Sequence, residues 1–210
     1  MATIAAEKRA LRKLVSARLK ALSVSDIGQQ SEAIASRVLT LPAFKESRRI
    51  SCYMSMPTSE VVTTSLVSDI LDHGKTLFIP KISVEPPGRM DFLQLHGKED
   101  LGSLKAGTWG IKEPDLHWLG SPRQSEAPGI DLILVPGVAF DRSMSRLGHG
   151  KGYYDKFIST YVEAGNKRPL LVALALREQI CDNAAVPITP HDWKMDMIVT
   201  PDEVIRSESP

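Results

Sequence analysis

The chain begins with apolar side chains at the spacing of an amphipathic helix. Over residues 7–22 they lie three or four positions from one another along one stripe, at Leu11, then Leu14 and Val15, then Leu19 and Leu22. This spacing places them on one face of a helix, so it predicts a helix over residues 7–22 with that face buried.

Four cations crowd the first turns of this predicted helix: Lys8, Arg9, Arg12 and Lys13. The N-terminus is the positive end of the helix dipole, so cations are electrostatically unfavourable there. A solvated helix face is the simpler explanation, and a bound anion is the alternative.

Beyond this helix the hydrophobic pattern alternates between strands and helices. Further helices are predicted from Ser25 or Asp26, either of which can cap the helix, to Leu39, and over residues 63–73, which Gly74 closes. Short apolar runs predict strands at residues 50–54, 76–79, 92–95, 131–135, 170–176 and 197–200. Residues 114–129 are predicted to form a surface loop, and the residues after Thr200 a polar tail.

The run at residues 131–135 indicates the fold class. Leu132, Ile133, Leu134 and Val135 suit burial on both faces, as in a central strand of a parallel sheet. We therefore predict an α/β fold, a three-layer sandwich with a mostly parallel central sheet, in a single domain over residues 1–210 with a short polar C-terminal tail. In such folds ligands bind beyond the carboxyl ends of the strands.

Composition excludes several classes of protein. The 210 residues carry 26 Lys and Arg against 25 Asp and Glu, a net charge of +1, which argues against nucleic-acid or membrane partners. The cysteines Cys52 and Cys181 are too few for a disulfide scaffold, and no run approaches the roughly 20 apolar residues of a membrane helix. We expect a cytoplasmic monomer; the basic N-terminus leaves a mitochondrial transit peptide as the alternative, although Glu7 interrupts it.

A glycine-rich run carries the densest chemical signal of the chain. Gly148, Gly150 and Gly152 alternate with other residues, and Arg146 and Lys151 add positive charge beside them. Glycine permits positive φ, so successive N–H groups can turn inward around an anion, and a helix over residues 153–165 would direct its N-terminus to the same place. The loop is predicted to bind phosphate, with a simple tight turn as the alternative.

The spacing of this loop departs from the two commonest phosphate loops. A dinucleotide-binding fingerprint requires glycine where this chain has Tyr153, and a Walker A loop requires Ser or Thr where it has Gly152. Neither class of site is therefore predicted.

The same run resembles the hallmark of a known family, the 5-formyltetrahydrofolate cyclo-ligases, also called 5,10-methenyltetrahydrofolate synthetases. The matching residues are Arg146-Leu147-Gly148-His149-Gly150-Lys151-Gly152-Tyr153-Tyr154-Asp155. Residues 8–12, 60–63, 109–114, 135–141 and 191–196 extend the resemblance in the family's order. It therefore covers nearly the whole chain.

The resemblance implies an ATP-dependent ligase that converts 5-formyltetrahydrofolate to 5,10-methenyltetrahydrofolate and releases ADP and phosphate. The formyl oxygen is phosphorylated and N10 of the folate then attacks the activated carbon. A reduced folate and MgATP are the implied small-molecule partners, with Mg²⁺ as cofactor and ATP as co-substrate.

The resemblance also implies roles for individual residues. The catalytic residues are Lys151, Tyr154 and Arg146. The nucleotide contacts are Lys8, Arg12, Arg146, Gly148, Gly150, Gly152 and Asp155, and the magnesium ligands are Asp155 and Asp192. The folate contacts are Met54, Glu60, Trp109, His149, Gly150, Lys151, Gly152 and Tyr153.

Other interpretations stay open at this point. Met54 is also a typical core residue, and Asp192 is also typical of a turn cap. A silent folate- or nucleotide-binding protein would keep the same scaffold, although intact Lys151, Tyr154 and Asp155 argue against it. An RNA-binding domain led by the basic first helix is disfavoured by the near-neutral charge.

Overall fold

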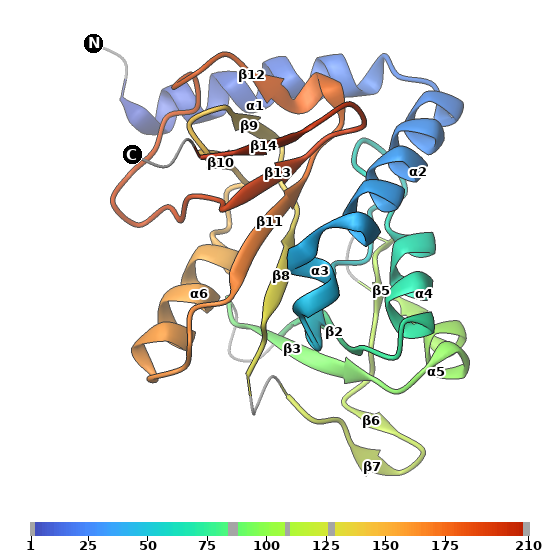
Figure 1. The fold of residues 1–210 in the computed structure, drawn as a ribbon. Helices are drawn as coiled ribbons and strands as arrows, with labels where there is room; N and C mark the ends of the chain where they lie inside the picture. Colours follow the sequence, from blue (N-terminus) through green and yellow to red (C-terminus); the bar gives the residue numbers. More distant parts are fainter. Residues whose placement is uncertain (1–2, 84–87, 108–109, 126–128, 208–210) are drawn as a thin grey trace.

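The central feature of the computed structural model is a seven-stranded sheet (Figure 1). The structure describes residues 3–83, 88–107, 110–125 and 129–207. Across the sheet the strands are β14 (Val204–Arg206), β13 (Met197–Val199), β11 (Leu170–Leu174), β8 (Leu132–Val135), β1 (Arg49–Ser51), β2 (Thr76–Ile82) and β3 (Met90–Leu95). The five inner strands run parallel, and β14 and β3 pair antiparallel at the two edges. The predicted mostly parallel sheet is confirmed.

Helices cover both faces of this sheet and make the predicted three layers. Helices α2 (Val24–Thr40), α3 (Pro42–Glu46) and α4 (Thr64–Asp72) pack on one face, and α6 (Tyr153–Glu163) packs on the other. The remaining helices are α1 (Ile4–Lys20) and α5 (Lys98–Ser103). Alternate residues of β8 face opposite layers: Leu132 and Leu134 belong to the core beneath α2 and α4, whereas Ile133 and Val135 belong to the core beneath α6. Complete burial of both sets explains why β8 reads as a continuous apolar run.

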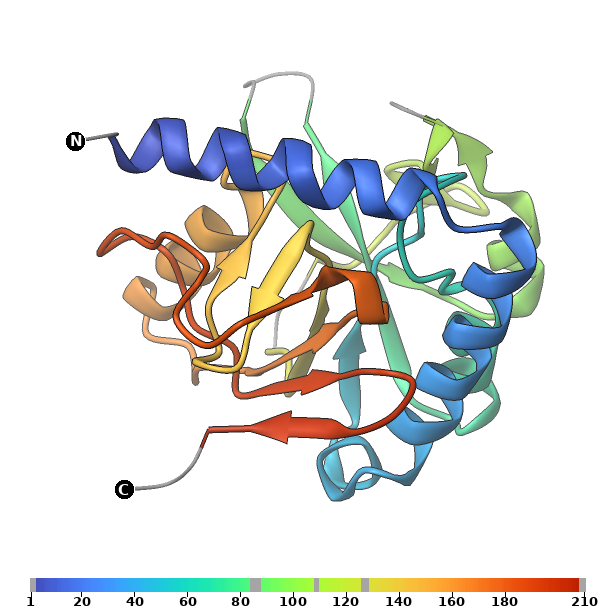
Figure 2. The ribbon, with the colours of Figure 1, turned by 90° about the horizontal axis from the view of Figure 1, so that it is seen from above.

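A second, smaller sheet forms where the inner strands end. It consists of β10 (Arg146–Leu147), β9 (Ala139–Asp141) and β12 (Ile180–Cys181), and the sequence pattern did not predict it. Helix α1 packs against β9 and against the 3-10 helix η2 (Arg177–Gln179), the segments that follow β8 and β11 (Figure 2). The first helix therefore lies over the carboxyl ends of the strands.

Two local predictions at the first helices are corrected by the structure. Leu14 was predicted to be buried but is 51% exposed, whereas Val15 and Leu19 are buried. Ser23, and not Ser25 or Asp26, caps α2. The Ser23 Oγ accepts from the Asp26 backbone N at 3.0 Å while the Asp26 carboxylate accepts from the Ser23 N. Asp26 is therefore the third helical residue of a capping box.

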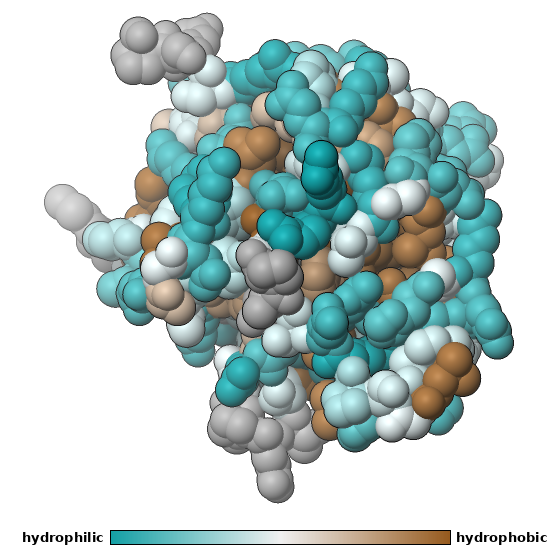
Figure 3. Space-filling view, turned by 60° about the horizontal axis from the view of Figure 1, so that its bottom comes forward, coloured by the Kyte–Doolittle hydropathy of each residue, from teal (hydrophilic) through white to brown (hydrophobic). Residues whose placement is uncertain are grey.

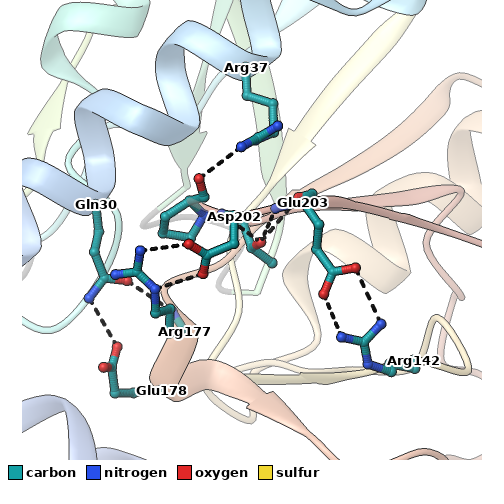
Figure 4. Close-up of polar contacts among 9 residues, drawn as sticks. Gln30, Arg37, Arg142, Arg177, Glu178, Asp202 and Glu203 are labelled. Atoms are coloured by element: carbon teal, nitrogen blue, oxygen red, sulfur yellow. Dashed lines mark hydrogen bonds and ion pairs between the residues drawn. The ribbon is translucent and has the colours of Figure 1, made fainter.

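The predicted polar tail is wrong, because it contains edge strand β14. Its polar residues are paired around the β13–β14 turn (Figure 4). Arg37 donates to the Pro201 carbonyl at 2.9 Å, and Arg177 binds both carboxylate oxygens of Asp202. These contacts join the turn to α2 and η2, a tertiary effect that local polarity does not show.

Residues 114–129 contain a small hairpin rather than only a loop. Strands β6 (His117–Trp118) and β7 (Ser121–Pro122) pair antiparallel, and the following Arg123 is buried. Its guanidinium binds both oxygens of Asp100 in α5, with a distance of 2.5 Å from Nη2 to Oδ1, and both side chains are 1% exposed. Burial alone would raise the pKa of Asp100, but hydrogen bonds from Arg123 and from the His96 N–H hold this pKa below its usual value.

In the part of the chain that the structure describes, no helix combines the length and apolar character needed to cross a bilayer. The face shown in Figure 3 is mainly hydrophilic, with apolar side chains in smaller groups between the polar ones.

Loss of the buried Arg123–Asp100 pair tests how the hairpin is anchored. We expect Arg123→Met to lower the free energy of unfolding by about 3–5 kcal/mol, because it leaves the Asp100 charge buried without its partner. Urea unfolding followed by circular dichroism measures this change. The double variant Arg123→Met with Asp100→Leu should be no less stable than the single one, since no unpaired charge remains. A single variant as stable as the wild type would contradict the prediction.

Candidate active site

A cavity of about 250 Å³ opens at the carboxyl ends of β1 and β8. Tyr53 and Met54, which follow β1, line it together with Pro136, which follows β8. Further lining comes from β2 and β3, from the segment containing β5 (Lys112–Glu113), and from the glycine loop, with Pro80, Ile82, Met90, Ile111, Glu113, Arg146, Gly148, His149, Lys151, Gly152, Tyr153, Tyr154 and Asp155. The predicted position of a ligand, beyond the strand ends, coincides with this cavity.

The glycine loop joins β10 to the first turn of α6. Gly150 and Gly152 have φ angles of 100° and 68°, in the left-handed region, and Gly152 is the N-cap of α6. The loop therefore ends at a helix N-terminus, where backbone N–H groups lack partners within the helix. The sequence predicted the loop and the helix that follows it, but strand β10, which contains Arg146, was not predicted.

Helix α1 lies directly against this loop. Arg12 Nε donates to the Gly148 carbonyl oxygen at 2.8 Å, and a Cβ added at Gly150 would lie 3.5 Å from the Arg12 Cζ. The cations of the first helix and the glycine loop, 136 residues apart in sequence, thus meet in one place.

Arg146 is buried at the base of the loop. Its Nη2 lies 2.6 Å from the Asp155 Oδ2 and its Nη1 donates to the Pro136 carbonyl at 3.1 Å, while no described residue accepts from its buried Nε. The guanidinium carbon is 5.7 Å from the centroid of the Tyr154 ring, a cation–π distance. This side chain is therefore positioned by a strand, an ion pair and an aromatic ring.

The two aspartates predicted to bind metal are both paired with cations. Asp155 Oδ1 accepts from the Trp193 N at 3.0 Å, and its Oδ2 binds Arg146. Asp192 Oδ2 lies 2.5 Å from the Lys8 Nζ and accepts from the Thr189 N at 2.6 Å. Burial alone would raise the pKa of Asp192. The hydrogen bonds from Lys8 and Thr189 together lower this pKa by more than burial raises it, so it lies below its usual value. Asp192 thus also caps a turn, as the alternative interpretation had it.

These carboxylates fit Mg²⁺ only as a minor part of its ligand set. Among the residues that the structure describes, no three His, Cys, Asp or Glu side chains gather around a metal-sized space. Mg²⁺ commonly takes one or two carboxylates and fills its remaining positions with phosphate oxygens and water. The donor set at Asp155 and Asp192 suits an ion that arrives with a phosphate-bearing ligand.

Glu60 contributes a buried carboxyl group to the lining of the cavity. It is 6% exposed, and its Oε1 accepts a hydrogen bond from the Met56 N. Burial raises its pKa to about 7, against the lowering effect of the Met56 bond. Met54 is 4% exposed and lines the cavity, so it is both a core residue and a wall residue.

The remaining predicted residues divide by exposure. Lys151 and His149 are both exposed to solvent. The imidazole of His149 is nevertheless partly desolvated by the surrounding protein, and this desolvation, together with the nearby charges of Arg12 and Arg146, lowers its pKa. Tyr153 is half-buried, and the Tyr154 hydroxyl is buried with no hydrogen-bond partner among the described residues. Burial raises the pKa of Tyr154, so it stays protonated. Trp109 lies outside the described residues.

Sequence reasoning missed several wall residues. Pro80, Ile82 and Met90 come from strands whose apolar pattern signals only burial. Glu113, whose Oε2 lies 3.3 Å from the Lys81 Nζ, also lines the cavity. It belongs to residues 109–114, which resemble the family, but nothing in that segment distinguishes Glu113 as a wall residue.

Comparison with known proteins agrees with this geometry. Residues 4–201 match the model of the 5-formyltetrahydrofolate cyclo-ligase family. A protein of Schizosaccharomyces pombe named probable 5-formyltetrahydrofolate cyclo-ligase is 38% identical over 208 residues, covering 96% of this chain and 98% of the relative. An Arabidopsis thaliana protein named 5-formyltetrahydrofolate cyclo-ligase, mitochondrial, is 37% identical, covering 95% of this chain and 76% of the relative.

A solved structure extends the likeness to three dimensions. The NMR structure of 5,10-methenyltetrahydrofolate synthetase from Aquifex aeolicus has a TM-score of 0.76 and 30% identity, covering 97% of this chain and 94% of that chain. Sequence and fold agree over almost the whole length, and the chain is an enzyme that belongs to the 5-formyltetrahydrofolate cyclo-ligase family.

Proposed function

We propose that this cyclo-ligase uses MgATP to convert 5-formyltetrahydrofolate to 5,10-methenyltetrahydrofolate, with release of ADP and phosphate. The observation that carries the proposal is the junction of two unlike halves in one cavity. One half of its lining is the glycine loop with Arg146 and Lys151, and the other half consists of apolar side chains such as Met54 and Met90 together with the carboxyl group of Glu60. A triphosphate suits the first half, and a flat heterocycle suits the second.

The chemistry of the substrate explains the need for ATP. A formamide oxygen is a poor leaving group, so the formyl oxygen first attacks the γ-phosphorus and ADP leaves. N10 then attacks the activated formyl carbon, the C–O bond breaks, phosphate departs and N10 loses its proton. The protein contributes mainly by holding both substrates in line and by neutralising the moving negative charge.

The ion pairs of the loop supply the charges for this task. We propose that Lys8, Arg12 and Arg146, with the backbone of Gly148, Gly150 and Gly152, bind the nucleotide phosphates. Asp155 and Asp192 would bind Mg²⁺, which neutralises phosphate charge. Transfer of either carboxylate to the metal would free its partner, Arg146 or Lys8, to bind a phosphate oxygen.

Lys151 and Tyr154 are proposed to act on the reacting groups. Lys151 is exposed and forms no ion pair with a described residue, so its ammonium is available to the transferred phosphoryl group. Tyr154 keeps its proton and presents an unpartnered buried hydroxyl that can donate a hydrogen bond. Arg146 stabilises negative charge beside it.

The folate half is proposed to use the walls of the cavity. Met54, Tyr153 and Trp109 would contact the rings, and Glu60 would accept hydrogen bonds from pterin nitrogens. His149 and the backbone of Gly150, Lys151 and Gly152 would lie where the two substrates meet. We further propose a single domain over residues 1–210, a monomer, and no nucleic-acid partner. The mitochondrial name of the Arabidopsis thaliana relative means that family membership does not specify the compartment.

One assay tests the central proposal. The purified protein is mixed with 5-formyltetrahydrofolate and MgATP, and the near-ultraviolet absorbance of the methenyl product is followed together with phosphate release. Equal amounts of product and phosphate are expected. Product without ATP, or phosphate release that does not require the folate, would overturn the proposed chemistry.

Removal of the Lys151 ammonium tests its position at the transferred phosphoryl group. We expect Lys151→Ala to lower kcat by about 100- to 1000-fold with a smaller effect on the KM for ATP, because the charge is used as negative charge migrates. Steady-state kinetics measure both constants, and Lys45→Ala, at an exposed lysine of α3, is the matched control. Full turnover in Lys151→Ala would refute the role.

Neutralisation of Asp155 tests the metal proposal. We expect Asp155→Asn to raise the magnesium concentration for half-maximal activity by roughly tenfold or more, since a carboxylate ligand is lost. The measurement is a magnesium titration at saturating ATP, with Asp69→Asn in α4 as the control. An unchanged titration midpoint would reject Asp155 as a ligand.

The raised pKa of Glu60 makes a pH prediction. An acceptor for pterin N–H groups has to be ionised, so kcat/KM for the folate should rise as pH increases through about 7. We expect Glu60→Gln to lower kcat/KM by about 10- to 100-fold and to lose this rise. Exposed Glu163→Gln in α6 is the control. A variant that keeps the wild-type pH profile would contradict the assignment.

A further inference from the structure

A groove beside α6 continues the active-site cavity on its outer side. Its volume is about 590 Å³, and it lies between α6 and the segment from Gly88 to Asp91. Met90 and Tyr153 line both the groove and the active-site cavity. The cavity and the groove therefore adjoin at these two side chains.

The groove follows the whole length of the helix. Its lining residues on α6 and just after it recur at helical spacing, at Tyr153, Lys156, Phe157, Thr160, Tyr161 and Ala164. With a rise of 1.5 Å per residue this face is about 16 Å long. The groove thus suits an extended chain rather than a compact molecule.

An uncompensated cation stands near the start of this groove. Lys156 is exposed and forms no hydrogen bond or ion pair with the residues that the structure describes. It lies in the first turn of α6, where the helix dipole is positive and a cation is unfavourable. A bound anion would relieve this charge.

The other charged groups that line the groove do not cancel Lys156. Arg89 Nε binds the Asp91 Oδ1 at 2.8 Å, so these two charges compensate each other. Asp91 is the only acidic residue among the groove's described lining residues. The lining therefore has a net positive charge.

We propose that this groove binds the glutamate tail of the folate substrate, with Lys156 as the anchor for its carboxylates. A reduced folate joins its pterin through a benzoyl group to a glutamate, so it ends in two carboxylates at physiological pH. With the pterin at Glu60, the benzoyl ring passes between Met90 and Tyr153, and the glutamate lies along α6. The inference rests on the proposed function, since it assigns the remainder of the same substrate.

A substrate without the glutamate tests this assignment. The KM values of 5-formyltetrahydrofolate and 5-formyltetrahydropteroate, which share the pterin and benzoyl groups, are compared in the wild type and in Lys156→Glu. We expect Lys156→Glu to raise the KM for the folate by roughly three- to tenfold, with kcat unchanged and the KM for the pteroate unchanged. Lys156→Arg should keep the wild-type preference. The rise should shrink as salt is added, because the contact is exposed.

The controls separate the two levels of the proposal. Lys156→Glu improves the match to the helix dipole, so the variant should fold, which thermal unfolding checks. Lys45→Glu, at an exposed lysine of α3, should leave both KM values unchanged. Equal effects of Lys156→Glu on the two substrates, or none on either, would overturn the tail site. Absence of ATP-dependent turnover of the pteroate and the folate by the wild type would instead overturn the proposed function.

Discussion

The hydrogen bond from Arg12 to the Gly148 carbonyl is the contact on which the rest of the site depends. It attaches the first helix to a loop that begins after β10, and both lie where the parallel strands end. Without this contact the cations of α1 would be a solvated helix face. With it, Arg12 lies against the glycine loop, which ends at the N-terminus of α6.

Two aspartates compensate the positive charges of Lys8 and Arg146 beside the glycine loop. Several cations close together repel one another, and the pairing of Lys8 with Asp192 and of Arg146 with Asp155 reduces that cost in the folded chain. The same two pairs link α1, β10, α6 and residues 189–193. The ion pairs that organise the fold therefore contain the groups proposed to bind the ligand. In the proposed complex the cations would bind phosphate oxygens and the aspartates would bind the metal ion, so each would exchange its present partner for a ligand.

The cavity and the groove share Met90 and Tyr153 as lining residues, and the two linings differ in polarity. The cavity holds the buried carboxyl group of Glu60 among apolar and aromatic walls, and the groove carries the exposed ammonium of Lys156. A substrate with a hydrogen-bonding ring, a hydrophobic middle and an anionic end matches this set of surfaces. Thus the selectivity for a folate would come from the arrangement of ordinary side chains along α6 and β3 more than from any single residue.

The sequence by itself determined the elements that depend on the periodicity of apolar residues or on the backbone freedom of glycine. The four buried residues of β8, the stripe of α1 and the glycines before α6 each follow from periodicity or from backbone freedom, and the likeness in the glycine run indicated the family. Tertiary structure alone decided which distant groups meet. The Lys8–Asp192 pair joins residues 184 apart, and the Arg37 bond to the Pro201 carbonyl, which holds the β13–β14 turn, joins residues 164 apart. The Arg123–Asp100 and Arg146–Asp155 pairs are closer in the chain, but each joins two different elements whose packing is tertiary. The physical reason is that burial and pairing of charges depend on neighbours in space, which a one-dimensional pattern of polarity does not contain.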